Sequence, residues 1–396
     1  MSIPEIFPKL ANKERLNYLR KSEWDVYYSC KNRYPYLVVE NLHPTILHQQ
    51  QQINRQDIED PFRPDPKIPP SCQLTLPIYD NLKRYGLSPG HNAPAGTHRS
   101  SLNVWSETFM FSNMTPQEIT FNAGVWVILE NWVKRLIRHP KLTRLRCITG
   151  STPAGSGNKA RRRVWDPSAN RMTTVNVPSH MFKIIVSEDR REFQANVGKI
   201  SDTAPLYVAC FLYPNTSVIP TPKTWDLAKY RVMIDDIERL TGYSIYALIG
   251  RYYKSNPIGR IESLEKVASI DFQPNDGLLI QMERAKYYYR LAYGKSRREI
   301  DKVWNELLKN AERLQISDLS HHEMYRNARL SVLNNSSQKH GYTSSSSSAS
   351  TLSLDKSEPK SQTKTQKSKL QTKTKKPKVQ NKTQTKTKTK KHKHIK

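Results

Sequence analysis

Four polar side chains within residues 91–130 could together hydrolyse a phosphodiester bond: His91, Asn113, Asn122 and Glu130. A neutral imidazole can take a proton from water, which makes His91 a candidate general base. Amide and carboxylate oxygens are hard ligands that suit Mg²⁺, an ion that keeps several of its waters. The pattern alone is a weak signal, because asparagine and glutamate near a helix more often cap it or face solvent. His91 itself lies in GLSPGHNAP, where a histidine is more often a polar loop residue than a base.

A strand, a loop and a helix would have to gather these side chains in one place. The stretch ETFMFSN ends at Asn113 and is predicted to be a strand. The stretch TPQEITFNAGVWVILENWVKRLIRHP is predicted to be a helix, because apolar residues recur every three or four positions until Pro140. Asn122 lies near the start of this helix, and Glu130 follows about two turns later on broadly the same side.

The remaining elements indicate an α+β fold around a mixed or antiparallel sheet. Five further stretches are rich in the residues that favour strands: WDVYYSC, YPYLVVENL, LRCITG, FKIIVS and LYVACFLY. A strand edge in LAKYRVMIDDIERLTGY leads into a helix that ends at Gly242. The glycines are too scattered for a dinucleotide-binding or P-loop motif, which argues against those two enzyme classes.

The charge of the chain points to a polyanionic partner. Its 396 residues carry a formal net charge of +29, which predicts nucleic acid first and an anionic membrane surface a distant second. No apolar stretch approaches the ~20 residues that span a bilayer, and the N-terminus lacks the apolar core of a secretion signal. We therefore expect no membrane anchor. The compartment stays unknown, with cytoplasm, nucleus and a packaged particle as the candidates.

The four cysteines, Cys30, Cys72, Cys147 and Cys210, are far apart and form no CxxC pair or Cys/His cluster. This spacing argues against a disulfide framework and against a structural zinc site, and it mildly favours a reducing compartment. Cysteine usage is thus expected to add no covalent constraint to the fold.

Three ordered stretches, SPGHNAPA, SETFMFSNMTPQ and FNAGVWVILENWV, resemble the signature of the DNA/RNA non-specific endonucleases. This ββα-metal (His-Me finger) family includes the Serratia nuclease and endonuclease G. The resemblance covers roughly residues 23–255, with support from CITGSTP, VPSHMFKIIV and YRVMIDDIERLTGYSIY. It implies a ββα-metal fold with a central mixed or antiparallel sheet. Several ordered motifs with matching spacing are far more specific than any single one.

The resemblance also implies a role for each of the four polar residues. His91 would be the general base, and Asn122 would be the direct ligand of Mg²⁺, with Mn²⁺ as a substitute. Glu130 would hold a metal-bound water, and Asn113 would help to position the site or the phosphate. The implied activity is cleavage of DNA and RNA without sequence specificity, leaving 5′-phosphate ends. Dimerisation is common in the family, which makes a second copy of this chain a candidate partner.

The chain departs from the family pattern next to the histidine, where SPGH stands in place of DRGH. Ser88 replaces the aspartate, and Pro89 replaces an arginine expected to stabilise negative charge on the phosphate. Losing one such donor commonly costs about 10²–10³ in rate. Three arginines are candidate phosphate-binding residues that could compensate: Arg63, Arg84 and Arg99.

Two functions therefore stay open. The first is an active, Mg²⁺-dependent endonuclease, supported by His91, Asn122 and Glu130. The second is a catalytically weakened nuclease-fold protein that binds or packages nucleic acid, supported by Pro89 and by the lysines near the C-terminus. The second function predicts tight, salt-sensitive binding to any polyanion.

Composition divides the chain into four parts. These are a leader with some helical character (1–22), an endonuclease-like domain (23–255), a helical extension (256–334) and a disordered basic tail (335–396). The extension is predicted to hold two helices broken at Gly294. Its run Tyr287–Tyr289 is expected to pack on the main domain, with stacking on bases as the alternative. The tail is too polar to bury a core, and it could bind phosphates or act as a localisation signal.

Overall fold

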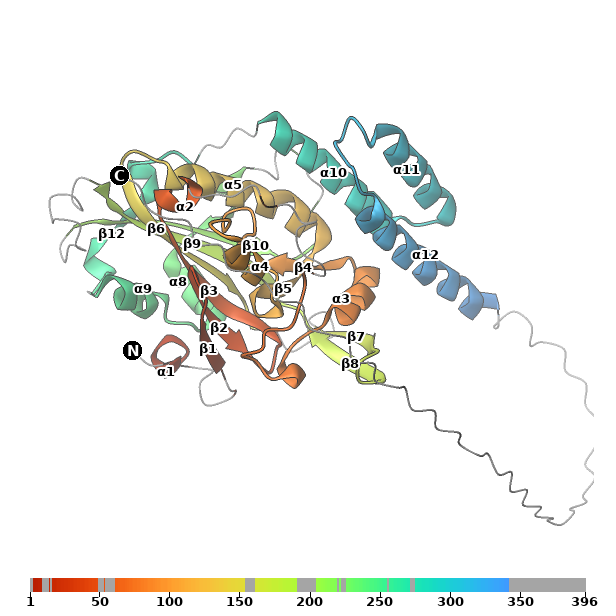
Figure 1. Ribbon diagram of the computed structural model, residues 1–396, viewed down its shortest axis with the longest axis horizontal. Coiled ribbons are helices and arrows are strands. Elements are labelled where there is room, and N and C mark those ends of the chain that lie inside the picture. Colours follow the sequence, from red (N-terminus) through yellow and green to blue (C-terminus); the bar gives the residue numbers. More distant parts are fainter. Residues whose placement is uncertain are drawn as a thin grey trace, which may run out of the picture. The chain divides into compact units, whose positions relative to one another are not determined.

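A sheet of eight strands forms the centre of the described part of the chain (Figure 1). Its order is β1-β2-β3-β6-β9-β10-β11, all antiparallel, and β12 joins β10 in parallel. The strands are β1 (Leu16–Arg20), β2 (Trp24–Ser29), β3 (Tyr34–Leu42), β6 (Leu142–Ser151), β9 (His180–Asp189), β10 (Leu206–Pro214), β11 (Arg231–Val232) and β12 (Ile261–Ser263). The computed structural model describes residues 3–8, 14, 16–48, 53, 61–153, 161–190, 204–218, 221, 226–254, 256–270 and 275–341.

Each face of the sheet buries its own apolar core. Side chains alternate between the faces along a strand, so Ile184 and Ile185 belong to different cores. One core lies under α5 (Trp126–Ile137). The other lies under α8 (Ile234–Thr241) and α9 (Ile245–Tyr253). Helices on both sides of an antiparallel sheet confirm the predicted α+β class.

The five stretches predicted to be strands are confirmed as β2, β3, β6, β9 and β10. The strand edge and helix before Gly242 are also confirmed, as β11 and α8, and Gly242 adopts the left-handed conformation that ends the helix. The sheet begins earlier than expected, because β1 lies inside residues 1–22 and pairs with β2. A short helix, α1 (Ile3–Ile6), precedes it.

Two short strands, β4 (Leu87–His91) and β5 (Met114–Glu118), and the helical segment that follows them, η5 (Phe121–Val125) with α5, form a ββα unit. This unit is here called the finger. Strands β4 and β5 pair antiparallel. The chain between them forms α4 (Leu102–Glu107) and the 3₁₀ turn η4 (Phe111–Asn113). One π-helical turn, η5, then leads into α5.

Two predictions about the finger are wrong in detail. The stretch ETFMFSN is a helix end and a 3₁₀ turn rather than a strand, and the predicted helix of residues 115–140 begins with a strand. Every residue of β5 is buried, so this strand shows no alternation of apolar and polar residues. The strong helical period of residues 125–137 therefore hides the strand in front of it.

The remaining elements surround this framework. They are α2 (Pro44–His48), η2 (Pro70–Cys72), α3 (Leu76–Leu82), η3 (Lys83–Tyr85), η7 (Leu227–Tyr230), η8 (Ile258–Arg260), η9 (Leu264–Lys266) and a hairpin of β7 (Arg161–Asp166) with β8 (Arg171–Asn176). None of the helices in the described ranges is at once long and apolar enough to cross a membrane.

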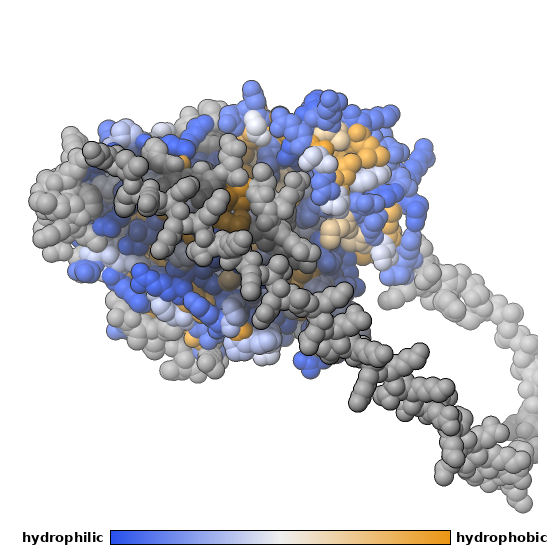
Figure 2. Space-filling model, in the orientation of Figure 1, coloured by the Kyte–Doolittle hydropathy of each residue, from blue (hydrophilic) through white to orange (hydrophobic). Residues whose placement is uncertain are grey.

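The helical extension packs directly on the finger. It consists of α10 (Asp276–Tyr293), α11 (Arg297–Asn310) and α12 (Ser320–Gly341), and its first two helices break at Gly294 as predicted. Tyr288 packs beside the finger residue Ile119, which confirms the packing role expected for the tyrosine run. Figure 2 shows apolar residues among hydrophilic ones over these helices. Helix α12 passes the predicted end of the extension at residue 334, and residues 342–396 of the expected tail lie outside the described residues.

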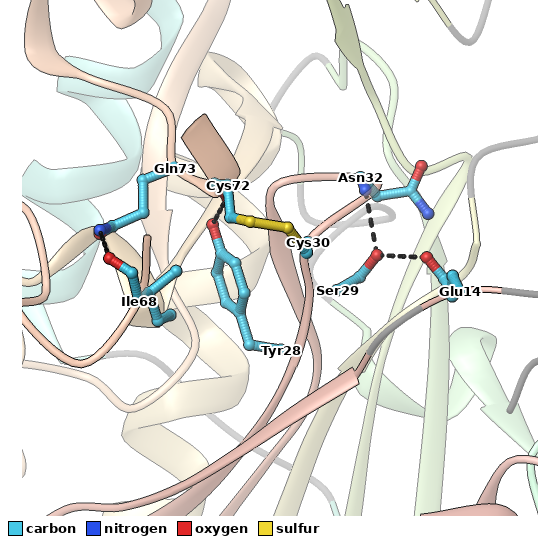
Figure 3. The surroundings of a disulfide bond; sticks show 8 residues. All are labelled: Glu14, Tyr28, Ser29, Cys30, Asn32, Ile68, Cys72 and Gln73. Carbon is cyan, nitrogen blue, oxygen red and sulfur yellow. Dashed lines mark hydrogen bonds between the residues drawn. A yellow bond between two sulfur atoms is a disulfide. The ribbon is translucent and has the colours of Figure 1, made fainter. Parts of the chain in front are cut away.

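A disulfide joins Cys30 to Cys72, so the expectation of no disulfide is wrong (Figure 3). The two residues are 42 positions apart in sequence, but β2 and η2 bring their Cα atoms within 4.5 Å. Tyr28 adds a second link between β2 and η2, because its hydroxyl donates to the carbonyl of Cys72 at 2.8 Å. Sequence spacing failed here because only the fold brings distant cysteines together. The bond also removes the support that cysteine usage lent to a reducing compartment.

Candidate active site

His91 ends strand β4, where aromatic side chains hold its ring. Its backbone is opposite Met114 in the ladder with β5. The imidazole meets Phe109 edge to face, with ring centroids 5.0 Å apart, and Phe62 lies 6.1 Å away. These ring contacts restrict the imidazole and help to set its orientation.

Asn113 is fully buried and fastens the loop that follows His91. Its amide nitrogen donates to the carbonyls of Ala93 at 2.9 Å and Thr108 at 2.8 Å. Its amide oxygen accepts from the backbone N–H of Ala93 at 2.9 Å. Both the nitrogen and the oxygen of the Asn113 amide are therefore hydrogen-bonded to the backbone, and this side chain positions the loop after His91.

Asn122 lies in the π-helical turn, where its amide faces strand β4. Glu118 Oε2 accepts from the backbone N–H groups of Thr120 and Phe121 at 2.8 Å each, which caps this turn. The amide nitrogen of Asn122 donates to Ser88 Oγ at 3.0 Å. Its amide oxygen makes no hydrogen bond within the described residues. Ser88 thus holds the amide nitrogen of Asn122 toward β4.

Two glycines allow side chains to approach the finger closely. A Cβ at Gly90 would overlap the amide of Gln117 on β5. Gly86 has a φ of +71°, and a Cβ added there would overlap the hydroxyl of Tyr293 from the extension. Any larger residue at these positions would displace the strand that carries His91.

A cavity of about 520 Å³, here called the catalytic cavity, lies beside His91. The finger contributes Ser88, Pro89, His91 and Asn122, α3 and η3 contribute Leu76, Tyr79, Asp80 and Lys83, and the extension contributes Asp318, Ser320, His321 and Met324. The structure therefore brings His91 and Asn122 to one cavity, together with both residues that depart from the family pattern. The extension residues had no signal in the sequence, because only packing places α12 there.

Glu130 lies on α5, away from this cavity and near the buried charges of Glu40 on β3 and Lys183 on β9. It is not among the residues that line the catalytic cavity. Burial raises the pKa of Glu130 to about 7, against the lowering effect of the charge on Lys183. The carboxylate of Glu40 acts on the same pKa in the raising direction. Its assignment to a metal-bound water stays a prediction.

A buried histidine joins the loop after His91 to the sheet. His98 bonds Glu23 Oε2 through Nδ1 at 2.6 Å and Glu40 Oε1 through Nε2 at 2.8 Å. Burial alone would lower the pKa of His98, but its hydrogen bonds to the two carboxylates outweigh that effect and raise it. His98 is therefore a structural imidazolium rather than a second catalytic base.

None of the three candidate arginines lines the catalytic cavity. Their guanidinium groups donate to other parts of the fold: Arg63 to Ser106 Oγ, Arg84 to the carbonyl of Arg163, and Arg99 to the carbonyl of Ile53. Each group is thus already used in holding loops together, and a phosphate-binding role for it stays a prediction.

Lys83 is the one lysine or arginine among the described residues that line the catalytic cavity. It is 6% exposed, and its ammonium donates to Asp80 Oδ1 at 2.6 Å and to Met324 Sδ at 3.1 Å. An ammonium has three protons, so one remains for a ligand. Sequence reasoning missed Lys83 because it lies outside the SPGH motif, on a separate 3₁₀ turn.

The amide oxygen of Asn122 is a hard donor of the kind that a magnesium ion takes. Among the described residues, no group of three or more histidine, cysteine or acidic side chains could hold a metal. The available donor is the amide oxygen of Asn122, and Mg²⁺ accepts few protein ligands because it keeps most of its waters. This donor would suit the implied ion, and a magnesium site at Asn122 stays a prediction.

Comparisons with known proteins assign the chain to a family. The sequence model of the DNA/RNA non-specific endonucleases matches residues 7–248. The human mitochondrial nuclease EXOG is 27% identical over 212 residues, which cover 54% of this chain and 52% of that protein. The mitochondrial nuclease 1 of Schizosaccharomyces pombe is 30% identical over 219 residues, or 54% and 61% of the two chains.

A solved structure of the EndoG/EndoGI complex aligns with a TM-score of 0.46 and 23% identity, over 66% of this chain and 97% of that chain. The chain spans 52% and 61% of the length of the two nucleases above. The family match covers more than half of the chain, from just after helix α1 into helix α9. The chain therefore belongs to the DNA/RNA non-specific endonuclease family.

Proposed function

We propose that this chain is a Mg²⁺-dependent endonuclease that cleaves DNA and RNA without sequence specificity. One observation carries the proposal: His91 and Asn122 come from different elements of the finger and line the same cavity. Family membership supports the substrate class. The net charge of +29 supports a polyanionic substrate, and phosphate contacts carry no sequence information.

The chemistry follows from the two residues. His91 takes a proton from water, and the water oxygen attacks phosphorus. The bond from phosphorus to the 3′ oxygen breaks, and this oxygen takes a proton from solvent, which leaves 5′-phosphate and 3′-hydroxyl ends. A Mg²⁺ at Asn122 would supply neutralisation of the phosphate charge. Asn113 keeps the His91 loop in place, and Ser88 holds the amide nitrogen of Asn122 toward β4.

Lys83 takes over the electrostatic role that Pro89 cannot fill. It lines the same cavity as His91 and keeps one ammonium proton for a phosphate oxygen. Asp80 and Met324 fix its position, so little side-chain freedom is lost on binding. A lysine gives one point charge where an arginine would give a bidentate contact, which predicts slower turnover than the DRGH motif allows.

The test is cleavage of plasmid DNA and of a folded RNA by the full chain with Mg²⁺. His91→Ala and Asn122→Ala are expected to lose at least 10²-fold in rate, and His139→Ala, a histidine at the end of α5, is expected to keep it. EDTA should stop cleavage and added Mg²⁺ or Mn²⁺ should restore it.

Equal cleavage by wild type and His91→Ala would contradict the proposal. Absence of cleavage together with tight, salt-sensitive binding of both nucleic acids would favour the weakened nuclease-fold protein that binds or packages nucleic acid. Sedimentation of the same sample would show whether the active form is a homodimer.

A further inference from the structure

A second cavity, here called the extension pocket, lies between the finger and the helical extension. Its volume is about 640 Å³, which lies within the range of cavities that take one small organic molecule. Its walls are Ile119, Asn122 and Ala123 from the finger, Gln281, Arg284 and Tyr288 from α10, Gln315, Ile316, Ser317 and Asp318 from the chain after α11, and His321 and His322 from α12. Most of this wall lies outside residues 7–248, the part that matches the family.

The extension pocket adjoins the catalytic cavity at the predicted metal ligand. Asn122, Asp318 and His321 line both cavities. A nucleic-acid strand with its scissile phosphate at Asn122 would therefore have one neighbouring nucleotide on the His91 side. The neighbour on the other side would enter the extension pocket.

His322 gives this pocket an unused polar group. Its side chain is 3% exposed, and neither ring nitrogen has a hydrogen-bond partner within the described part of the chain. The ring stacks on Tyr288 with centroids 4.0 Å apart and planes 4° from parallel, which fixes its position. Burial and then the charge of Arg284 lower the pKa of His322 to about 4, so the ring is neutral with one donor and one acceptor.

Arg284 adds positive charge to the same wall. Its Nε and Nη2 donate to the carbonyls of Leu314 at 2.6 Å and Gln315 at 2.5 Å, which fixes the chain that leads to α12. The Nη1 group makes no hydrogen bond within the described ranges and can face a phosphate. Gln281 contributes a neutral amide, and Asp318 keeps the pocket from being uniformly cationic.

We propose that the extension pocket binds one unpaired nucleotide of the substrate strand, next to the scissile phosphate. His322 would hydrogen-bond the edge of the base, and Arg284 would contact the adjoining phosphate. The assignment rests on the proposed nuclease function, because it places the strand at Asn122. A base must leave its duplex to enter such a pocket, so the extension confers a preference for single strands.

The test measures binding without cleavage. The full chain carrying His91→Ala is titrated with a fluorescent 12-nucleotide DNA strand and with a 12-base-pair duplex in Mg²⁺. His322→Phe keeps the ring stack and removes both nitrogens, and it is expected to weaken single-strand binding about tenfold with less than a twofold effect on the duplex. Gln281→Ala is a second variant, chosen because it breaks no hydrogen bond, and a loss in the same direction is expected.

Arg313→Gln is the matched control, because it removes a cation from the same extension outside the pocket, and neither affinity should change. Equal losses for strand and duplex in His322→Phe and Gln281→Ala, or no loss in either variant, would overturn the proposal. Because His91→Ala blocks the reaction, these outcomes do not depend on cleavage. If wild type cleaves no nucleic acid but the variants lose single-strand affinity selectively, the pocket proposal stands and the nuclease proposal is refuted.

Discussion

At the scale of single residues, the departure from DRGH changes two contacts in different ways. Pro89 removes a cationic donor, and Lys83 lines the same cavity from η3. Ser88 accepts a hydrogen bond from the amide of Asn122, so the replacement of aspartate by serine keeps a group that orients this side chain. The sequence predicted His91 and Asn122 because motif order survives divergence. It missed Ser88 and Lys83 because their roles come from contacts between elements.

Ser88→Ala should weaken the apparent Mg²⁺ affinity of the nuclease. The amide of Asn122 would lose its partner on β4, and removal of such an orienting group typically costs 10–100-fold in metal affinity. The measurement is cleavage rate against Mg²⁺ concentration, where Ser88→Ala should need more ion but reach a similar maximal rate. Ser168→Ala, in the β7–β8 turn, is the control, and an unchanged Mg²⁺ dependence of Ser88→Ala would refute the orienting role.

His98→Gln should destabilise the fold in a pH-dependent way. The pKa of His98 is raised above its ordinary 6.5 in the folded state. Its stabilising contribution is therefore complete below pH 6.5 and is lost as pH rises through the raised value. Urea unfolding should show the largest gap between wild type and His98→Gln near pH 6, and a smaller gap near pH 9.

The partner carboxylate sets the acidic limit of this window. Burial raises the pKa of Glu23, but its hydrogen bonds to His98 and Ser100 outweigh burial and lower it below 4.5. Its contribution is present above pH 4.5 and is lost as pH falls through the lowered value. A gap that stays constant from pH 6 to pH 9 would show that His98 is neutral.

At the scale of elements, the finger and the extension form one packed body. The hydroxyl of Tyr325 on α12 donates to the carbonyl of Leu87 at 3.0 Å, at the start of the strand that carries His91. The hydroxyl of Tyr293 on α10 donates to Glu118 Oε1 at 2.7 Å, on the carboxylate that caps η5. The extension thus supports both halves of the candidate site.

Tyr293→Phe should destabilise the protein by about 1–3 kcal/mol, because a buried carboxylate would lose one hydrogen-bond donor. Burial already raises the pKa of Glu118, so the lost donor should raise it further. Chemical denaturation measures the cost, and Tyr289→Phe on the same helix is the matched control. Equal stability of Tyr293→Phe and Tyr289→Phe would contradict a support role for the extension.

Element types were predictable where one period dominates the sequence. The strands of the central sheet and helices α8, α10 and α11 follow their apolar patterns. Strand β5 did not, because it is buried on both faces and is followed at once by a strongly amphipathic helix. Neither the π-helical turn at Asn122 nor the position of α12 over the cavity has a local signature.

At the scale of the whole molecule, one covalent bond limits the unfolded chain. The bond between Cys30 and Cys72 spans 42 positions and ties the central sheet to the segment before α3. Sequence alone predicted the charge and the family, but it missed this link, since the pairing needs the fold to exist first. The two free cysteines, Cys147 and Cys210, are buried and offer no alternative partner at the surface.

Reduction of the disulfide should lower the free energy of unfolding by up to about 4 kcal/mol, the loop-closure value for a loop of this length. The measurement is thermal unfolding with and without a phosphine reductant. The Cys30→Ser/Cys72→Ser double variant should match the reduced wild type and be insensitive to reductant. A reductant effect of equal size in the double variant would assign the loss to another cause.

The length of helix α12 can be compared with the length of a nucleic-acid strand. The first residues of the helix reach the catalytic cavity, and its 22 residues extend about 33 Å before the chain continues into the segment with 16 lysines between residues 355 and 396. At about 3.4 Å per base step, that length corresponds to roughly ten base steps of nucleic acid. A strand that lay along α12 from the catalytic cavity would need about this many steps to reach the last turn of the helix.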